Sequence, residues 1–242
     1  MNPMASRQSP IGTIMQVLPK IGSVLRNLEP TWHLPSLDLL DAEFVAHHRI
    51  KALIWDVDGT ITNFHDTTVA DEARAFRTLS SIPDLQHAIL SNAGEDRFRE
   101  LGTIFPAVPV LKGYWWEDAV ALRQILRGED SWSAEQVAER AAAGAMPLRK
   151  PHGELVLAVT RHLGLVPHDV VMVGDQYFTD IAGANLAGVR SIKLSAIGPE
   201  SLPRSIRMGQ MVERLVYRLL HGAPCGSAHV IVPLPGRADA PR

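Results

Sequence analysis

The chain has 242 residues, of which 46% are hydrophobic and 21% are charged, as in an ordinary globular protein with a substantial core. Its net charge of −2 excludes broad electrostatic binding of nucleic acid, because such binding needs a strongly basic face. No stretch is long and apolar enough to span a bilayer, and the single cysteine, Cys225, has no partner for an internal disulfide, so we expect a soluble cytoplasmic protein.

Residues 1–50 alternate short apolar groups with prolines, which indicates a loosely structured lead-in. One short helix is predicted near Leu37–His48. Ser36 or Asp38 is expected to cap it, because short oxygen-bearing side chains satisfy the first N–H groups of a helix. The sequence leaves open whether this lead-in packs on the rest of the protein.

Residues 51–200 alternate strand-like and helix-like segments, as in a parallel sheet covered by helices on both faces. The strand candidates are nearly continuous apolar runs, which is typical of strands buried on both sides. We therefore predict an α/β fold with a three-layer, Rossmann-like parallel sheet. The predicted strands are Ala52–Trp55, Ala88–Ser91, Val108–Leu111, Val170–Val173 and Arg190–Leu194. The predicted helices are Asp71–Ser80, Glu95–Thr103, Trp116–Leu126, Ala134–Ala143, Gly153–Leu163 and Thr179–Ala187.

The connection from residue 113 to residue 146 is longer than a strand-to-strand crossover requires, and it holds two of the predicted helices. We therefore predict a small helical insert that forms at most a minimal cap. Residues 201–223 are predicted to form a C-terminal helix, because apolar residues recur there at helical spacing. Residues 224–242 are rich in proline, glycine and alanine, which predicts a flexible tail.

Two aspartates, Asp56 and Asp58, stand at the end of the apolar run Ala52–Trp55. Residues two apart in a strand share a face, so both carboxylates are expected at the edge where open α/β sheets bind ligands. Two carboxylates at close range repel each other, which raises the pKa of one of them. The pair therefore needs a cation, a shared proton or a donor-rich substrate.

Three further polar groups are expected at the same edge. Ser91 and Asn92 supply a hydroxyl and backbone N–H groups, Lys150 supplies a cation, and Asp175 and Asp180 supply two more acids. Carboxylates can hold Mg²⁺, which prefers oxygen ligands, and cationic and N–H donors can surround a phosphate dianion. A carboxylate left over can act as a nucleophile. This combination points to phosphoryl transfer.

In this order and spacing, the four groups resemble those of the haloacid-dehalogenase-like (HAD) superfamily of phosphohydrolases, over about Lys51–Leu194. The resemblance implies that Asp56 attacks phosphorus and becomes an aspartyl-phosphate. It implies that Asp58 protonates the leaving oxygen and then deprotonates the water that hydrolyses the intermediate. The implied cofactor is Mg²⁺, held by the Asp56 carboxylate, the Asp58 backbone carbonyl and Asp175.

The same resemblance implies roles for the other site residues. Ser91 and the following backbone N–H, that of Asn92, would hold the phosphoryl oxygens. Lys150 would balance the charge of Asp56 and the phosphate. Asp180 would act from outside the metal's ligand set, through water or by orienting Lys150.

Each of these residues also has an ordinary structural interpretation. Asp58 can cap a turn, and Ser91 with Asn92 can start a helix. Lys150 can be a surface residue, and Asp180 can be the N-terminal acid of a helix, where the helix dipole favours negative charge.

Finer details resemble subclass IIIA of the superfamily, and within it the phosphatidylglycerophosphatase-like branch. These details are the segments Gly174–Gln176, Thr179–Ile181 and Gly183–Asn185, and Gly188. Gly59 departs from the pattern, because that branch commonly has asparagine there. The resemblance implies a phosphomonoester substrate: either a lipid head-group phosphate such as phosphatidylglycerophosphate, or a soluble sugar or nucleotide monophosphate.

The partners are also open. Four arginines accompany the apolar spacing of the C-terminal helix, which can lie peripherally on the inner face of an anionic membrane or dock on the domain or on a second copy. A homodimer that covers the site would favour a small soluble substrate, and an exposed site would favour a lipid. A non-catalytic scaffolding or regulatory role normally accompanies loss of the nucleophile or the lysine, and both are present.

Overall fold

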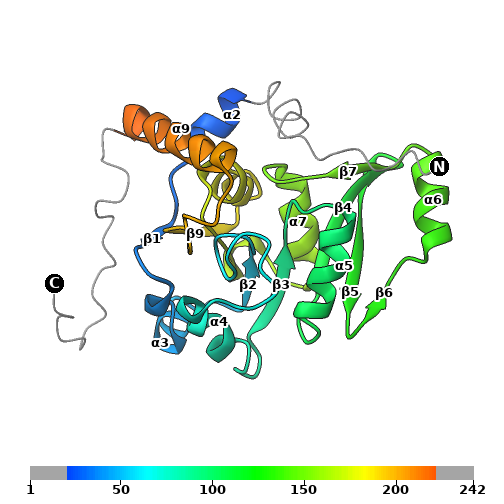
Figure 1. The fold of residues 1–242 in the computed structure, drawn as a ribbon, viewed down its shortest axis with the longest axis horizontal. Coiled ribbons are helices and arrows are strands. Elements are labelled where there is room, and N and C mark those ends of the chain that lie inside the picture. The colour runs from blue at the N-terminus through cyan, green and yellow to red at the C-terminus, as the bar shows by residue number, and fades with distance from the viewer. Residues whose placement is uncertain (1–20, 222–242) are drawn as a thin grey trace.

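The computed structural model describes residues 21–221, so the predicted tail 224–242 and Cys225 lie outside the described residues. Within this range, nine strands form one sheet in the order β1-β9-β8-β2-β3-β4-β5-β6, with β7 paired to β4 (Figure 1). The strands are β1 (Trp32–Leu34), β2 (Ala52–Trp55), β3 (Gln86–Leu90), β4 (Val110–Trp116), β5 (Ala119–Leu126), β6 (Glu129–Asp130), β7 (Met146–Leu148), β8 (Val170–Gly174) and β9 (Arg190–Leu194).

The α-helices are α2 (Ile21–Arg26), α3 (Ala42–His47), α4 (Arg74–Leu79), α5 (Glu95–Ile104), α6 (Ala134–Ala142), α7 (Gly153–His162), α8 (Ala182–Leu186) and α9 (Arg204–His221). Short 3-10 turns are η2 (Leu37–Leu39), η3 (Asp71–Ala73) and η4 (Pro167–Asp169), and η5 (Tyr177–Ile181) is a π-helical turn. The strands from β1 to β4 in the sheet order are parallel, whereas β5, β6 and β7 run antiparallel to their neighbours.

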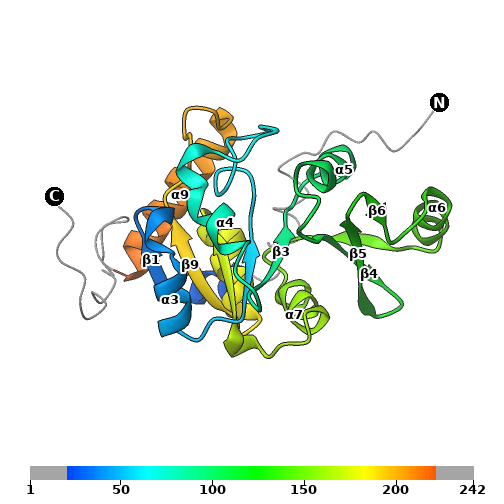
Figure 2. The same ribbon diagram turned by 90° about the horizontal axis from the view of Figure 1, so that it is seen from below.

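Helices cover both faces of the parallel part of the sheet (Figure 2). Side chains alternate along β2, so Leu53 joins Phe44 of α3 and Phe76 of α4 on one face. Ile54 joins Val156 of α7 on the other face. This arrangement is the predicted three-layer α/β fold, with β2 at its centre.

Residues 21–50 are more ordered than the predicted loose lead-in. β1 pairs with β9, and Leu34 and Phe44 are buried in the main core. The predicted helix is split, because Leu40 leaves helical backbone angles after η2. Ser36, one of the two expected caps, caps η2, and Asp41 caps α3 by accepting the N–H of Phe44. The prediction of one continuous helix is therefore wrong.

The predicted helix Trp116–Leu126 is wrong, because residues 119–126 form β5 and pair antiparallel with β4. Glu117 and Asp118 join the two strands with φ of 50° and 58°, as a two-residue type I′ turn requires. Arg127 and Gly128 (55° and 78°) form a similar turn before β6. Alanine, leucine, arginine and glutamine are among the strongest helix formers, but helix propensity is a small effect, and strand pairing overrides it here. The insert is therefore a strand extension carrying one helix, α6 (Figure 2).

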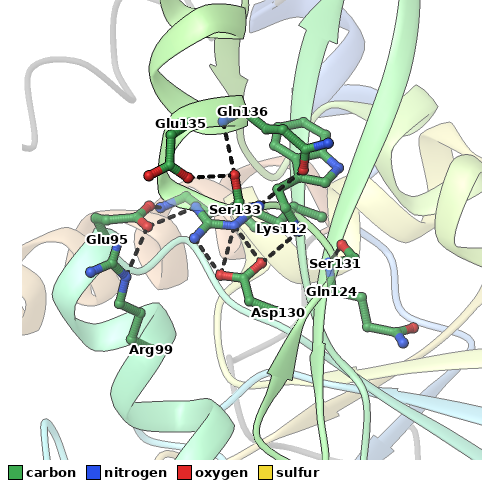
Figure 3. Close-up of polar contacts among 11 residues, drawn as sticks. Glu95, Arg99, Lys112, Gln124, Asp130, Ser131, Ser133, Glu135 and Gln136 are labelled. Atoms are coloured by element: carbon green, nitrogen blue, oxygen red, sulfur yellow. Dashed lines mark hydrogen bonds and ion pairs between the residues drawn. The ribbon is translucent and has the colours of Figure 1, made fainter.

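A hairpin network of five charged residues, Glu95, Arg99, Lys112, Arg123 and Asp130, ties this strand extension to α5 (Figure 3). The Arg123 side chain is 1% exposed and bonds both Asp130 and Glu95. Arg99 and Lys112 each lie 3.3 Å from Glu95. Every charge in the network therefore has a partner of opposite sign.

Helix α9 occupies the segment where a C-terminal helix is expected. It buries Glu213 and Tyr217 against η5, and the Tyr217 ring stacks on Tyr177 with 4.5 Å between ring centroids. Among residues 21–221, no helix has both the length and the apolar character needed to cross a membrane.

Candidate active site

The carboxyl ends of β2, β3 and β8 lie side by side, because these strands are parallel and paired. Asp56 directly follows β2, and its N–H donates to the carbonyl of Val173 in β8 (2.9 Å). Ser91 directly follows β3, and Asp175 directly follows β8. Lys150 comes from the loop between β7 and α7. The predicted residues thus meet at the edge of the sheet where α/β proteins bind ligands.

Lys150 lies at the centre of this site. Its Nζ atom is 2.6 Å from Oδ1 of Asp56 and 2.7 Å from Oδ1 of Asp180. All three side chains are buried, so water screens these ion pairs little. Burial alone would lower the pKa of Lys150, but the two carboxylates outweigh it and raise that pKa. Lys150 is therefore a buried charged group, and its interpretation as a surface residue is wrong.

Asn92 holds the backbone of Lys150. Its Oδ1 accepts the N–H of Lys150 (2.8 Å), and its Nδ2 donates to the carbonyl of the same residue (3.0 Å). These bonds occupy the Asn92 side chain, so its backbone N–H remains for the predicted phosphate contact. The hydroxyl of Ser91 accepts the N–H of Ala93 (3.2 Å), which supports the turn before α5.

Asp56, Asp175 and Asp180 form a buried acid cluster, in which one oxygen from each carboxylate lies within 4.8 Å of the others. Burial raises the pKa of Asp56 to about 7, although Lys150 opposes the change. Burial, and then repulsion from Asp56 and Asp180, raises the pKa of Asp175 well above its usual range. A bound cation would offset the surplus negative charge of this cluster.

The hydrogen bonds of the acid cluster indicate where a cation fits. Asp180 uses Oδ1 to bond Lys150 and Oδ2 to accept a backbone N–H (3.0 Å). Oδ2 of Asp175 accepts from Nε2 of Gln210 (2.6 Å), but its Oδ1 is buried without a hydrogen-bond partner. This orphaned oxygen beside Asp56 fits Mg²⁺, which prefers oxygen ligands.

Two glycines make room for the acid cluster. A Cβ atom at Gly174 would overlap the Asp180 carboxylate. Gly59 has a φ of +87°, and a Cβ atom there would lie 2.9 Å from Oδ2 of Asp175. Asparagine is one of the few other residues that adopt positive φ readily. Asparagine at residue 59 could adopt the backbone of this turn, but its Cβ atom would displace Asp175, so Gly59 fits the site as it is built here.

Asp58 is held by groups that sequence analysis missed. Its Oδ1 accepts from Nη2 of Arg97 (2.9 Å) and from the backbone N–H of His65 (2.9 Å). Arg97 is buried, and its Nη2 also donates to the carbonyl of Asp66 (2.8 Å). Arg97 lies in the first turn of α5, outside the four groups, so its position in the sequence carries no signal of this contact.

Helix α9 contributes two more residues that sequence analysis missed, Gln210 and Glu213. Glu213 accepts the N–H of Tyr177 (2.9 Å), and burial raises the pKa of Glu213 to about 7. A cavity of about 210 Å³ lies beside them, and Asp175 and Lys193 are among its lining residues. In the sequence, the only sign of this contact is that both polar residues lie on one face of an amphipathic helix, and this is the face that packs inward.

Comparisons with known proteins bear on the same segments. Residues 147–195, which include Lys150, Asp175 and Asp180, match the family described as HAD-hydrolase-like. A protein of Clostridium perfringens with the provisional name pyrophosphatase PpaX is 23% identical, with coverage of 64% of this chain and 90% of that protein.

Two solved structures were also matched, each over 64% of this chain. An uncharacterized protein from Listeria monocytogenes is 20% identical over 85% of its own chain, with a TM-score of 0.38. A 4-nitrophenylphosphatase from Thermotoga maritima is 15% identical over 90% of its chain, with a TM-score of 0.30. Likenesses this low carry no argument here.

The family match spans the segment that supplies three of the site residues, and the Clostridium protein matches over nine-tenths of its length. Neither comparison separates subclass IIIA or the phosphatidylglycerophosphatase-like branch from the rest of the superfamily. Over the segments that they match, both comparisons support the resemblance to the HAD-like hydrolase superfamily.

Proposed function

We propose that this protein is a Mg²⁺-dependent phosphomonoester hydrolase that works through an aspartyl-phosphate on Asp56. The observation that carries the proposal is the buried cluster in which Lys150 bonds Asp56 and Asp180 while Oδ1 of Asp175 has no partner. Asp56, Asp175 and the backbone carbonyl of Asp58 would hold Mg²⁺. When bound, Mg²⁺ would stabilise negative charge on the phosphoryl oxygens and keep Asp56 ionised.

In the proposed reaction, a carboxylate oxygen of Asp56 bonds to phosphorus while the bond between phosphorus and the leaving oxygen breaks. Asp58 donates a proton to the leaving oxygen, then accepts a proton from the water that hydrolyses the aspartyl-phosphate. Inorganic phosphate leaves, and Asp56 is regenerated. The contact from Arg97 restricts the orientation of Asp58 during both proton transfers.

The phosphoryl oxygens would be held by the Ser91 hydroxyl, the backbone N–H of Asn92 and Nζ of Lys150. The two bonds between the Asn92 side chain and the Lys150 backbone support this role. Because they join the two loops, the N–H donors and the cation keep a fixed spacing around one phosphate.

For the substrate, a lipid head-group phosphate such as that of phosphatidylglycerophosphate is the first candidate. Its support is the outer face of α9, where apolar side chains are 47% to 75% exposed. The exposed apolar residues are Met208, Met211, Val212, Leu215, Leu219 and Leu220. The exposed arginines of the helix are Arg204, Arg207, Arg214 and Arg218, and its acid, Glu213, is buried. Such a face suits peripheral contact with an anionic membrane, while the opposite face docks on the core.

A soluble phosphate ester, such as a sugar or nucleotide monophosphate, is the second candidate. The similarity to a protein named as a pyrophosphatase favours a small phosphorylated substrate. A homodimer that covers the site would accompany this alternative.

A phosphate-release screen tests the proposed chemistry. Lipid, sugar and nucleotide monophosphates and pyrophosphate would each be incubated with the full chain and Mg²⁺, with Asp56→Asn as the inactive control. We expect release from at least one class by the wild type alone. Equal release by the Asp56→Asn variant would refute the nucleophile.

Vesicle flotation tests the choice of substrate class. At low salt, vesicles with anionic lipid should retain the wild type, and Leu215→Asp with Leu219→Asp should abolish retention. Val166→Asp is the matched control, because Val166 is 58% exposed and lies outside α9. If anionic vesicles do not retain the wild type, the membrane contact is refuted and the soluble substrate is favoured.

A further inference from the structure

Helix α9 makes a hydrogen bond to the acid cluster with the side chain of Gln210. We infer that Gln210 is a positioning residue for Asp175, so the cation affinity of the site depends on the docking of the C-terminal helix. The inference rests on the proposed function, because it assumes that Asp175 is a ligand of the cation.

The hydrogen bond of Gln210 gives the two oxygens of Asp175 different roles. Nε2 of Gln210 donates to Oδ2 at 2.6 Å, and Oδ1 stays buried without a partner. A donor on one oxygen fixes the plane of the carboxylate and directs the other oxygen's lone pairs to a remaining ligand. Gln210 therefore orients Asp175 for a cation without occupying the oxygen that would bind it.

The amide suits this position in charge as well as in shape. A carboxylate at residue 210 would add a further negative charge beside Asp175, and an ammonium group would compete with the cation. The amide is neutral, and its N–H donates to the carboxylate. It orders the cluster without changing the surplus negative charge that attracts a cation.

Helix α9 is anchored where it can deliver this contact. Glu213 lies one turn after Gln210 and accepts the N–H of Tyr177, two residues after Asp175. Tyr217, a further turn along, stacks on the Tyr177 ring with an interplanar angle of 22°. Residues three or four apart share a helix face, so one face of α9 contacts both ends of the loop from 175 to 177.

The test measures binding of Mn²⁺ to the full chain by electron paramagnetic resonance, and of Mg²⁺ by calorimetry. Gln210→Met keeps the length of the side chain and removes its N–H donor. We expect the Kd for either cation to rise about 10- to 100-fold, as is typical when a group that orients a metal ligand is lost. Met211→Ala, on the exposed face of the same helix, should leave Kd unchanged.

A further readout and a second variant distinguish a positioning role of Gln210 from a loss of folding. Phosphate release by Gln210→Met should recover at saturating Mg²⁺, with kcat within about twofold of the wild type, because only ligand orientation has changed. If this variant does not fold, Gln210→Asn replaces it, since its shorter amide cannot span the same distance. An unchanged Kd in the folded variant, or an equal rise in Met211→Ala, would overturn the inference. A wild type that binds neither cation would instead refute the metal site of the proposed function.

Discussion

Two charged clusters in this protein, one partly exposed and one buried, differ in their balance of charge. In the hairpin network, Arg123 bonds both Asp130 and Glu95, and Arg99 and Lys112 also contact Glu95, so three cations meet two acids. In the acid cluster, Lys150 bonds Asp56 and Asp180, and Asp175 is the third carboxylate, so one cation meets three acids.

The difference separates a cluster that holds the fold together from one that is arranged for chemistry. Buried charges persist in proteins when they are paired, and the hairpin network meets that condition by itself. The acid cluster does not, and burial raises the pKa of Asp56 to about 7 in the absence of a cation. A buried group that has a perturbed pKa and lies among an excess of charges of one sign is typical of a functional site.

The largest expected effect comes from removing the nucleophile in the acid cluster. Asp56→Asn should lower phosphate release by about 10⁴-fold or more, because an amide cannot form the aspartyl-phosphate. The rate would be measured under Mg²⁺ saturation with the substrate found in the screen. Asp84→Asn, an exposed aspartate on the loop before β3, is the matched control and should keep its activity. Comparable rates for the two variants would contradict the assignment of Asp56.

Removal of the divalent cation should have nearly the same effect on activity. EDTA should lower phosphate release by about 10³-fold or more, and added Mg²⁺ should restore it, because the surplus carboxylates are the proposed ligands. Thermal unfolding gives a second readout: Mg²⁺ should raise the Tm of the wild type but not that of Asp175→Asn. Full activity in EDTA would show that the negative charge of the acid cluster is neutralised without a divalent cation.

The main sheet and most of the acid cluster could be predicted from sequence for one physical reason. Central parallel strands are continuous apolar runs, and their carboxyl ends share an edge, so polar residues that follow them must meet. Asp56 and Asp175 were found in this way, whereas Lys150 was found as the cation of the four-group pattern, just before a helix. The structure brings the three together. The roles of these residues in catalysis stay predictions.

Contacts made from helices could not be predicted in the same way. Arg97 and Gln210 lie on helices whose periodicity shows which face is buried but not which remote residue it meets. The strand β5 was missed because its residues also favour helices, and the turn at Glu117-Asp118 lacks the glycine that usually marks a type I′ hairpin. For Arg97 and Gln210 the missing information is a long-range contact, and for β5 it is the pairing with β4 across a turn that lacks its usual sequence signal.

The pH dependence of stability should distinguish the two clusters. In metal-free protein, burial raises the pKa of Asp56 from 3.8 to about 7, so the folded state keeps a proton that the unfolded chain releases. This proton stabilises the fold fully below about pH 4, and the stabilisation is lost as the pH rises through 7.

Urea unfolding in EDTA between pH 5 and pH 8 provides the measurement. The wild type should lose stability relative to Asp56→Asn as the pH rises, and Mg²⁺ at pH 8 should recover it. A stability difference that stays constant across this range would show that Asp56 does not carry the proton.

The smallest effect is expected from the hairpin network, where Arg123→Met should cost about 2 kcal/mol of folding free energy. A broken buried ion pair typically costs about 3–5 kcal/mol, but Asp130 and Glu95 are 27% and 36% exposed, so water compensates part of the loss. Phosphate release at saturating Mg²⁺ should stay within about twofold of the wild type, because the variant does not change the acid cluster. Urea unfolding and activity would be measured on the same preparation. A variant that is fully stable but inactive would reverse the assignment, because the hairpin network would then serve the chemistry.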